Sequence, residues 1–362
     1  MAYRFTFTPT IVRHLQTIER TRERLRHIVL PPALTEQLRT RAQLRATHYS
    51  TRIEGNRLTL KETEQVIQQG KLFPGRERDV KEVERYYRAL QQMERWGEGG
   101  QRITEERVKK LHALIFKGQR ARPPPYRDGQ NVIRESSGRI VYMPPEAEDV
   151  PALMKELVAW INGSAREAPV PVIAGLAHYQ FETIHPFFDG NGRTGRLLTT
   201  WILYRGSYDQ GKFYSLEEFY AQDLEGYYRA LVTHPHHNYY EGRDKADATP
   251  WLEYFLKGMA TVFEQVAGEV QTHVGQRVNE EEQQMLRNLD HRARRVLGFF
   301  ARHDVIKTAQ VAHLLGLSER HARDLLSEWV KQGWIEIADP SRKARKYRLA
   351  KEYRDLAFKE LK

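Results

Sequence analysis

Apolar residues three and four positions apart open the chain and predict an amphipathic helix. The residues that set this spacing are Ile11, Leu15, Ile18, Leu25 and Ile28. Pro31-Pro32 then interrupts the pattern, because proline ends a helix, and a second helix begins near Leu34. Similar spacing predicts helices over residues 62–69, 78–96 and 104–116. The first third of the chain is therefore expected to be almost wholly helical.

The segment 122–145 departs from this helical pattern. Two short β-branched runs, 132–133 and 140–142, flank Ser136-Ser137-Gly138, which predicts a β-hairpin. Helical spacing returns over residues 150–161, 173–183, 196–204, 224–232 and 251–278. The main body is therefore expected to be a mainly α domain that carries one hairpin.

The last part of the chain has its own pattern. After a polar helix at 279–288, three short helices are predicted over 292–302, 308–315 and 318–332, followed by strands at 334–337 and 346–349. This order is typical of a winged helix-turn-helix domain. We therefore expect domain boundaries near residues 100 and 270, which divide the chain into 1–100, 101–270 and 271–362.

Composition narrows the class of protein. The chain of 362 residues contains 40% hydrophobic residues and no cysteine, which excludes disulfides and thiol chemistry and suits a cytoplasmic location. We find no apolar run near the roughly 18 residues that a membrane span needs. The net charge of +11 is uneven, since residues 286–362 hold 18 Lys/Arg against 10 Asp/Glu. This excess favours an anionic partner, although it could also serve solubility alone.

A glycine-rich loop between two predicted helices is the first candidate site. An apolar helix ends at His185-Pro186, and a Gly-Asn-Gly turn opens the next helix. Gly190 and Gly192 lack Cβ, so the main-chain N–H groups there can surround phosphate oxygens at a helix N-terminus. Arg193 and Arg196 lie one turn apart at the start of the second helix. Cations at a helix N-terminus are unfavourable without an anionic ligand. The segment therefore predicts a polyanion site.

Two further side chains add chemistry to this loop. Asp189 could hold Mg²⁺ against the same phosphates through a carboxylate oxygen. A histidine has an unperturbed pKa near 6.5, so at neutral pH His185 could accept a proton from an attacking hydroxyl. Each feature alone has a simpler explanation, because single histidines are usually structural and Gly-Asn-Gly can be a plain turn. Their combination in one segment favours catalysis.

The string His185-Pro-Phe-Phe-Asp-Gly-Asn-Gly-Arg-Thr-Gly-Arg196 matches the motif of the Fic (Fic/DOC) family at every defined position. The resemblance covers roughly residues 30–260 and implies the helical Fic fold, with 101–270 as catalytic domain. It implies transfer of AMP from ATP to a Ser, Thr or Tyr hydroxyl of a target protein or of the protein itself. His185 would be the base and Asp189 the Mg²⁺ ligand. The nucleotide would be bound by Gly190, Asn191, Gly192, Arg193, Thr194, Gly195 and Arg196.

The resemblance also implies roles outside this loop. The hairpin would act as a flap whose strand residues Ile140, Val141, Tyr142 and Met143 pair with the target backbone; alternatively, the hairpin only covers the core. An aromatic side chain on a later helix would contact adenine, and Tyr227 or Tyr228 stands at that position. The usual Asn-Arg before this tyrosine pair is replaced here by Asp223-Leu224.

A second motif of the family lies N-terminal to the loop. Ser50-Thr-Arg-Ile-Glu54-Gly55 matches the inhibitory pattern (Ser/Thr)-x-x-x-Glu-(Gly/Asn). The resemblance implies that Glu54 reaches Arg196, takes the place of the γ-phosphate and keeps basal activity low. On spacing alone, Glu54 could equally be a solvated residue after a helix. In some family members the same glutamate supports the reverse reaction, removal of AMP.

The predicted winged helix offers a second binding surface. Its candidate DNA contacts are Arg320, His321 and Arg323 on the second helix and Arg342, Lys343, Arg345 and Lys346 in the wing. One candidate partner of this surface is duplex DNA. The alternative is a protein, which could be a second copy of the chain in a homodimer.

Two other functions are alternatives to AMP transfer. The first is a transcriptional regulator that binds DNA and senses nucleotide without chemistry. The second is a metal hydrolase, for which His178 with His185, or the group His234, His236 and His237, would supply ligands. The second leaves the anion loop unexplained.

Overall fold

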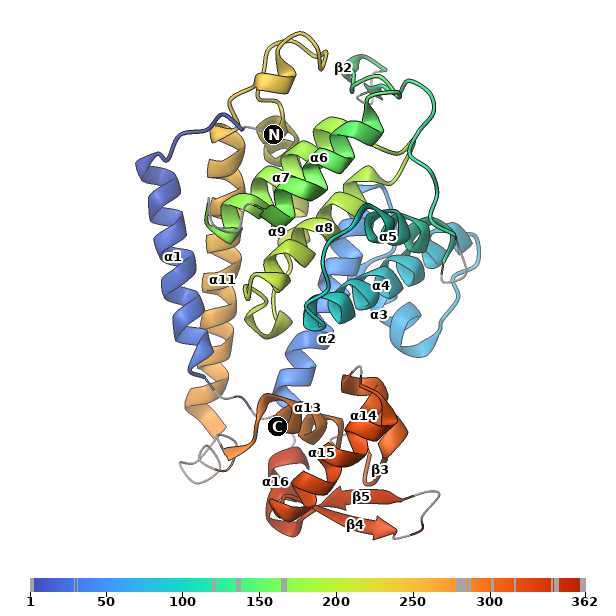
Figure 1. Ribbon diagram of the computed structural model, residues 1–362, viewed down its shortest axis with the longest axis vertical. Coiled ribbons are helices and arrows are strands. Elements are labelled where there is room, and N and C mark those ends of the chain that lie inside the picture. Colours follow the sequence, from blue (N-terminus) through green and yellow to red (C-terminus); the bar gives the residue numbers. More distant parts are fainter. Residues whose placement is uncertain are drawn as a thin grey trace. The chain divides into compact units, whose positions relative to one another are not determined.

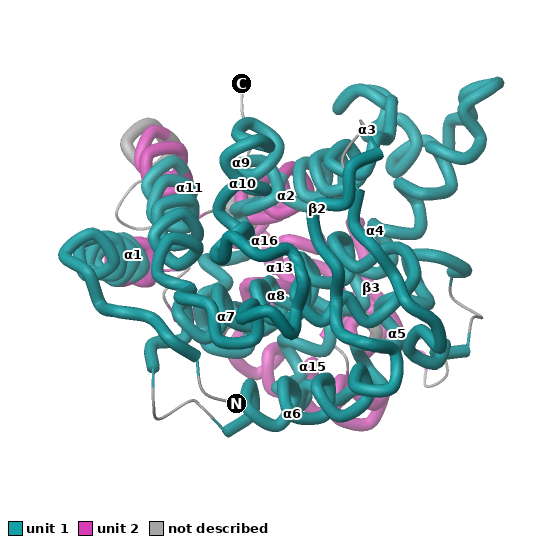
Figure 2. Tube along the Cα trace, turned by 90° about the horizontal axis from the view of Figure 1, so that it is seen from above, with its two compact units in different colours: residues 1–22, 42–265 teal, residues 23–41, 266–362 magenta. Residues whose placement is uncertain are grey.

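The computed structural model describes residues 3–28, 30, 32–118, 122–134, 138–163, 168–277, 285, 288–300, 303–315, 317–339, 341 and 345–358. The chain divides into two compact units, residues 1–22 with 42–265 and residues 23–41 with 266–362 (Figure 2). In the described residues the structure is mainly helical, with one sheet of two strands and one of three (Figure 1).

Most helices belong wholly or partly to the first unit. They are α1 (Pro9–Arg26), α2 (Pro32–Ile53), α3 (Leu60–Gln69), α4 (Glu77–Glu98), α5 (Glu105–Lys117), α6 (Val150–Gly163), α7 (Val170–Ile184), α8 (Asn191–Arg205), α9 (Leu216–Gln222), α10 (Leu224–Leu231) and α11 (Thr249–Arg277). Two 3₁₀ turns, η2 (Gln210–Lys212) and η3 (Arg243–Lys245), lie between them. Helices α1, α2 and α11 run across the division between the units.

The predicted hairpin is present in the first unit. Strand β1 (Ile133–Arg134) pairs antiparallel with β2 (Ile140–Tyr142), with an irregular register between Ile133 and Arg134. The serines of the predicted turn, Ser136 and Ser137, lie outside the described residues. The expectation of a mainly α body with one hairpin is confirmed.

Helix α7 places the candidate loop because it is buried along almost its whole length. Apolar residues lie on every side of this helix, which is typical of a helix at the centre of a domain. Trp251 of α11 donates its indole N–H to the Gly175 carbonyl at 2.7 Å, and a Cβ at Gly175 would lie 2.8 Å from the Phe255 ring. Helix α8 packs along α7 (Figure 1). The loop between them therefore starts and ends on rigid elements.

The second unit ends the chain. It contains α13 (His291–Phe300), β3 (Ile306–Lys307), α14 (Thr308–Leu315), α15 (Glu319–Lys331), β4 (Ile335–Asp339), β5 (Lys346–Leu349) and α16 (Lys351–Phe358). The sheet is antiparallel with the order β3-β5-β4. Ser318 caps α15 by accepting a hydrogen bond from the His321 main-chain N–H at 3.3 Å. Trp329 and Trp334 are fully buried in its core.

Most elements lie where the sequence predicts them, and three were missed. Helix α9, strand β3 and helix α16 are too short to show a period, because helical periodicity is read over about 11–18 residues. The polar helix predicted at 279–288 lies almost entirely outside the described residues. No helix in the part of the chain that is described has an apolar stretch sufficient to cross a bilayer.

Candidate active site

The loop between α7 and α8 is held in one conformation by its own residues. His185 closes α7 with φ 50° and ψ 60°, a left-handed conformation that costs a histidine energy. Gly190 has φ 79°, and a Cβ there would overlap the Phe116 ring, so glycine is required. The Asn191 side chain accepts from the Phe187 N–H at 2.9 Å and donates to its carbonyl at 2.7 Å. The loop is therefore preorganised.

Arg127 fixes this loop from outside, and the sequence gives no sign of it. Its Nε donates to the His185 carbonyl at 3.0 Å, and its main-chain N–H donates to the Pro186 carbonyl at 2.9 Å. The same guanidinium donates to the carbonyls of Gly129 and Pro145, which lie on either side of the hairpin. The residue is 3% exposed, and burial lowers its pKa. Arg127 thus links the hairpin to the strained histidine.

His185 is neutral at physiological pH. Burial lowers its pKa to about 4, while a hydrogen bond to the Glu182 main chain acts in the opposite direction. Its side chain is 17% exposed, and Nδ1 lies 4.0 Å from Oε2 of Glu182. A neutral imidazole has a free lone pair and can accept a proton. The side chain can therefore act as a general base.

The two arginines of the loop both bind carboxylates. Arg196 is buried, and it donates to Glu54 Oε1 at 2.8 Å and, through Nε, to Ser50 Oγ at 2.9 Å. It also donates to the Ser50 carbonyl at 3.0 Å. Arg193 donates to Glu82 of α4 and lies 3.6 Å from Asp189. Both cations that could bind phosphate are thus already neutralised.

Glu54 lies over the anion loop itself. It follows the last residue of α2, and Gly55 continues the turn with φ 91°. A Cβ at Gly192 would lie 2.5 Å from Glu54 Oε1 and 3.0 Å from Arg196 Nη1. The glycine therefore leaves room for the glutamate in the place where main-chain N–H groups open α8. The structure brings together Ser50, Glu54 and Arg196 in one contact.

Three of the residues expected to bind nucleotide have supporting contacts. The Asn191 amide is used inside the loop, as described above. The Thr194 hydroxyl donates to the Gly190 carbonyl at 2.8 Å, and Gly195 packs against Glu182 and Phe181. Their main-chain positions shape the start of α8, while the side chains of Arg193 and Arg196 are those that could hold phosphates.

The structure separates the two candidate adenine contacts. Tyr227 is buried and its hydroxyl bonds His178 Nε2 at 2.8 Å, so it belongs to the core. Tyr228 is 50% exposed, and its pKa is raised first by partial burial and then by Glu54, while Arg196 acts against the rise. Tyr228 is therefore the side chain that a base could stack on.

Asp189 fits a Mg²⁺ ion that is bound mainly by substrate. Its side chain is 65% exposed, and Oδ1 accepts from the Gly190 N–H at 2.6 Å. Mg²⁺ is often held by one or two carboxylates together with phosphate oxygens and water. A single exposed carboxylate beside an anion loop meets that requirement.

The flap residues have different surroundings. Tyr142 is buried and donates its hydroxyl to the Thr183 carbonyl at 2.7 Å. Met143 has both main-chain groups paired, since its N–H donates to the His237 carbonyl at 2.7 Å and its carbonyl accepts from Tyr239 at 3.1 Å. Ile140 and Val141 are partly exposed. A docking strand can therefore use Ile140 and Val141 but finds no free main-chain group at Met143.

The histidines proposed as metal ligands do not form a metal site. His178 uses Nδ1 with Thr199 and Nε2 with Tyr227, both at 2.8 Å, and burial lowers its pKa to about 3. Within the described ranges, no group of three or more His, Cys, Asp or Glu side chains could hold a metal ion. The prediction of a metal hydrolase has no support in this arrangement.

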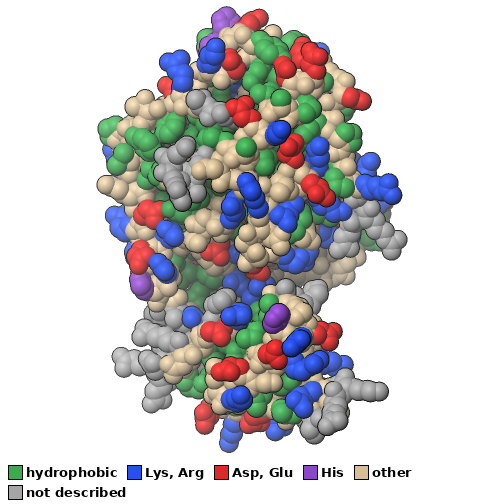
Figure 3. Space-filling view, viewed as in Figure 1, with side chains coloured by type: hydrophobic (Ala, Val, Ile, Leu, Met, Phe, Trp, Pro, Cys, Tyr) green, Lys and Arg blue, Asp and Glu red, His purple; other side chains and the backbone are tan. Residues whose placement is uncertain are grey.

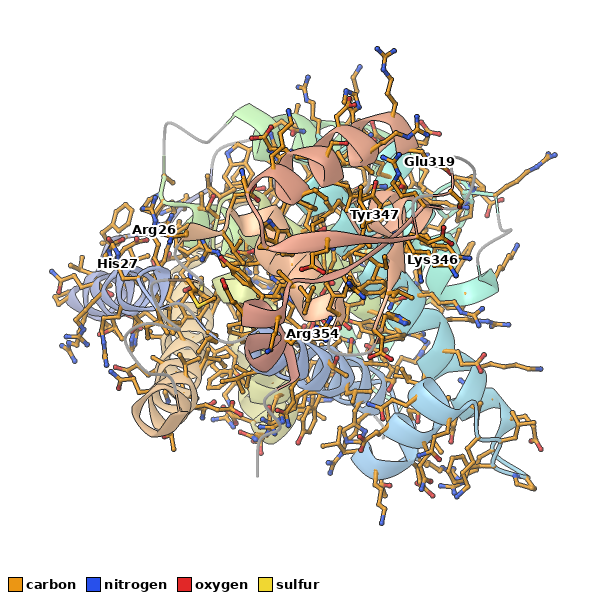
Figure 4. All side chains as sticks on the ribbon, turned by 90° about the horizontal axis from the view of Figure 1, so that it is seen from below. Arg26, His27, Glu319, Lys346, Tyr347 and Arg354 are labelled. Atoms are coloured by element: carbon orange, nitrogen blue, oxygen red, sulfur yellow. The ribbon has the colours of Figure 1, made fainter. Side chains whose placement is uncertain are left out.

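The candidate DNA contacts lie on the second unit. Arg320, His321 and Arg323 are exposed on α15, which begins at Glu319 (Figure 4). Lys346 begins β5 and, like Arg345, is partly exposed (Figure 4). Arg342 and Lys343 lie outside the described residues. Figure 3 shows Lys and Arg side chains on the visible face of this unit, interspersed with Asp and Glu side chains.

The structure thus shows a helical domain with a neutral histidine beside a glycine-rich loop that carries two arginines. The family model described as Fic/DOC family matches residues 102–203, so the chain contains a Fic/DOC domain.

Relatives of known name agree with this assignment. The chain is 28% identical over 207 residues to the protein adenylyltransferase Fic of Drosophila ananassae, and the match covers 54% of this chain and 39% of the relative. It is 26% identical over 273 residues to the protein adenylyltransferase fic-1 of Caenorhabditis briggsae, and that match covers 74% of this chain and 50% of the relative. The chain thus spans at most half the length of these two relatives.

One solved structure resembles almost the whole chain. The crystal structure of a Fic family protein from Desulfovibrio desulfuricans has a TM-score of 0.63 and 27% sequence identity. The match covers 97% of this chain and 99% of the other.

Proposed function

We propose that this protein is an autoinhibited protein adenylyltransferase that transfers AMP from ATP to a hydroxyl of a target protein or of itself. The contact between Glu54 and Arg196 carries the proposal. It places a carboxylate on the cation that would bind the γ-phosphate, beside a neutral histidine. The names of the relatives support the same activity.

The geometry of the loop supports the following reaction. The neutral His185 takes the proton of a Ser, Thr or Tyr hydroxyl, whose oxygen attacks the α-phosphate while the bond to pyrophosphate breaks. Once their carboxylate partners move away, Arg193 and Arg196 bind the phosphates together with the main-chain N–H groups at the N-terminus of α8. Asp189 would hold Mg²⁺, which neutralises charge on the leaving pyrophosphate. Ile140 and Val141 would align the target backbone.

The test compares two labelled forms of ATP with the purified Glu54→Gly protein. Label at the α-phosphate is expected to become covalently attached to protein, whereas label at the γ-phosphate is not, because AMP is the transferred group. Attachment of the γ-label would instead indicate a kinase. No attachment of either label, with or without a cell extract as source of targets, would contradict the proposal.

For the second unit we propose a winged helix that contacts duplex DNA. The exposed basic residues at the start of α15 and the antiparallel pair β4-β5 support it. A regulator that senses nucleotide without chemistry would share this surface. The intact base and arginines of the loop favour the enzyme over that alternative.

Binding of the whole protein to duplex DNA is expected to weaken steeply as salt concentration rises, because phosphate contacts release counterions. Arg320→Ala and Arg323→Ala should each reduce the slope of log K against log salt by about 1. Lys331→Ala, at the exposed end of the same helix, is the matched control and should leave the slope unchanged. Weak binding that salt does not affect would favour a protein partner. Fluorescence anisotropy with a labelled duplex measures these constants.

A further inference from the structure

Glu182 is a largely buried carboxyl that the mechanism above leaves unused. It lies in the last turn of α7, three residues before His185. A Cβ at Gly195 of α8 would overlap its Oε1 atom, so the glycine makes room for this side chain. Its two oxygens therefore lie between α8 and the catalytic histidine.

Two polar atoms here lack a well-formed hydrogen bond, although the His185 ring lies near the Glu182 main chain, which acts on its pKa. Among the described residues, neither Oε1 of Glu182 nor Nδ1 of His185 reaches solvent or makes a well-formed hydrogen bond. The other carboxyl oxygen, Oε2, lies 4.0 Å from this Nδ1. Unsatisfied buried polar groups are rare in native proteins, and a catalytic role is one accepted explanation. Hydrogen bonds of catalytic groups are often long in the free enzyme and shorten when substrate binds.

The enclosed position of Nδ1 decides which ring nitrogen of His185 can accept a proton from substrate. The His185 side chain is 17% exposed while Nδ1 does not reach solvent, which leaves Nε2 as the ring nitrogen for a substrate. A neutral imidazole carries one proton, and Nε2 can accept another only when that proton sits on Nδ1. The group that faces Nδ1 therefore selects between an active and an inactive tautomer.

We propose that Glu182 is a positioning residue for His185: its carboxylate accepts the Nδ1 proton and keeps Nε2 free to take the proton of the target hydroxyl. This inference rests on the proposed adenylyltransferase function. As the hydroxyl proton moves to Nε2, the new oxygen–phosphorus bond forms and the bond to pyrophosphate breaks. Glu182 gains no proton; its negative charge stabilises the imidazolium.

The charges around Glu182 determine the pH above which its carboxylate can accept the Nδ1 proton of His185. Burial raises its pKa to about 8, Arg196 of α8 acts against the rise, and Glu54 adds to it. Tyr227 of α10 also faces it. Below this pKa the protonated carboxyl donates to Nδ1, which puts the imidazole proton on Nε2 and blocks the base. Activity is therefore lost as pH falls through the pKa of Glu182. Glu54 raises that pKa and so favours the inactive tautomer.

The experiment measures AMP transfer by the Glu54→Gly protein and by the Glu54→Gly/Glu182→Gln protein from about pH 6 to about pH 9, a range that brackets the pKa of a perturbed catalytic carboxyl. In the first protein kcat should rise with pH. In the second, kcat should fall about tenfold or more at high pH, the rise should disappear, and the KM for ATP should stay the same. Glu217→Gln in the same background is the matched control, since Glu217 is a buried carboxyl with a raised pKa on α9.

The outcomes separate this inference from the proposed function. If the Glu54→Gly protein transfers AMP and the Glu182→Gln change alters neither kcat nor the pH profile, the main chain alone orients His185 and the inference is wrong. If the Glu54→Gly protein transfers nothing, the proposed function fails instead. Should the Glu182→Gln protein not fold, ¹⁵N NMR of the His185 ring in the Glu54→Gly protein decides. A proton on Nδ1 at high pH is expected, and a proton on Nε2 there would overturn the inference.

Discussion

Replacing Glu54 by glycine is expected to raise the rate of AMP transfer by about 100-fold, because a displacement near 1 Å of a reacting group can cost that factor. The side chain holds Arg196 at 2.8 Å and lies against Gly192, where the terminal phosphates of ATP would bind. Without it, Arg196 can bind the γ-phosphate, and the α-phosphate can turn towards the base. Glu54 follows the end of α2, so glycine there does not interrupt a helix. Initial rates of covalent labelling from α-labelled ATP measure the effect.

Two substitutions control for other causes of this rise. Glu54→Gln keeps the size of the side chain but removes its charge, and its activity should lie between those of the wild type and Glu54→Gly. Glu64→Gln removes an exposed charge from α3 and should leave the basal rate unchanged. Equal rates for the wild type and Glu54→Gly would exclude Glu54 as the inhibitor.

Replacing His185 by alanine in the Glu54→Gly background is expected to lower kcat by about 10²- to 10⁴-fold, the range that general base catalysis contributes. The ring is neutral at pH 7 because burial lowers its pKa to about 4. It is therefore ready to accept a proton without first losing one. Binding of ATP, measured by calorimetry, should change little because the arginines remain.

The backbone at position 185 makes a second variant useful. His185 has φ 50°, and asparagine tolerates this left-handed region better than most residues. His185→Asn should therefore remove the base with less disturbance of the loop than alanine, and should be equally inactive. Substantial transfer by both variants would show that another group takes the proton.

The parts of the site that are contiguous in the sequence could be predicted. The loop from His185 to Arg196 carries its base, carboxylate, glycines and arginines within one turn and one helix start, so spacing alone places them together. The second motif, with Ser50, Glu54 and Gly55, was found from its resemblance to the inhibitory pattern of the family, since its spacing alone fits a solvated glutamate equally well. Both segments are short enough to be read as motifs, whereas the contact between Glu54 and Arg196 spans 142 residues and is seen only in the fold.

The parts that depend on distant contacts could not be predicted. Glu82 reaches Arg193 across 111 residues, and Arg127 reaches the His185 carbonyl across 58. Nothing in the sequence marks these charges as buried, because charged residues are usually exposed. The sequence also could not decide whether Tyr227 or Tyr228 would contact adenine, because the answer depends on which side of the short helix α10 faces the core. Pairing of Met143 with residues 237–239 likewise follows from tertiary folding alone.

The Arg127 guanidinium has a consequence for the energetics of target docking. It bonds carbonyls on both sides of the flap, and the Tyr142 hydroxyl and the Met143 main chain add further attachments. The two ends of the flap are thus immobilised before any target arrives, so little conformational entropy remains to be lost there on binding. If the flap docks targets as proposed above, a target would need only a few main-chain contacts with Ile140 and Val141 to associate.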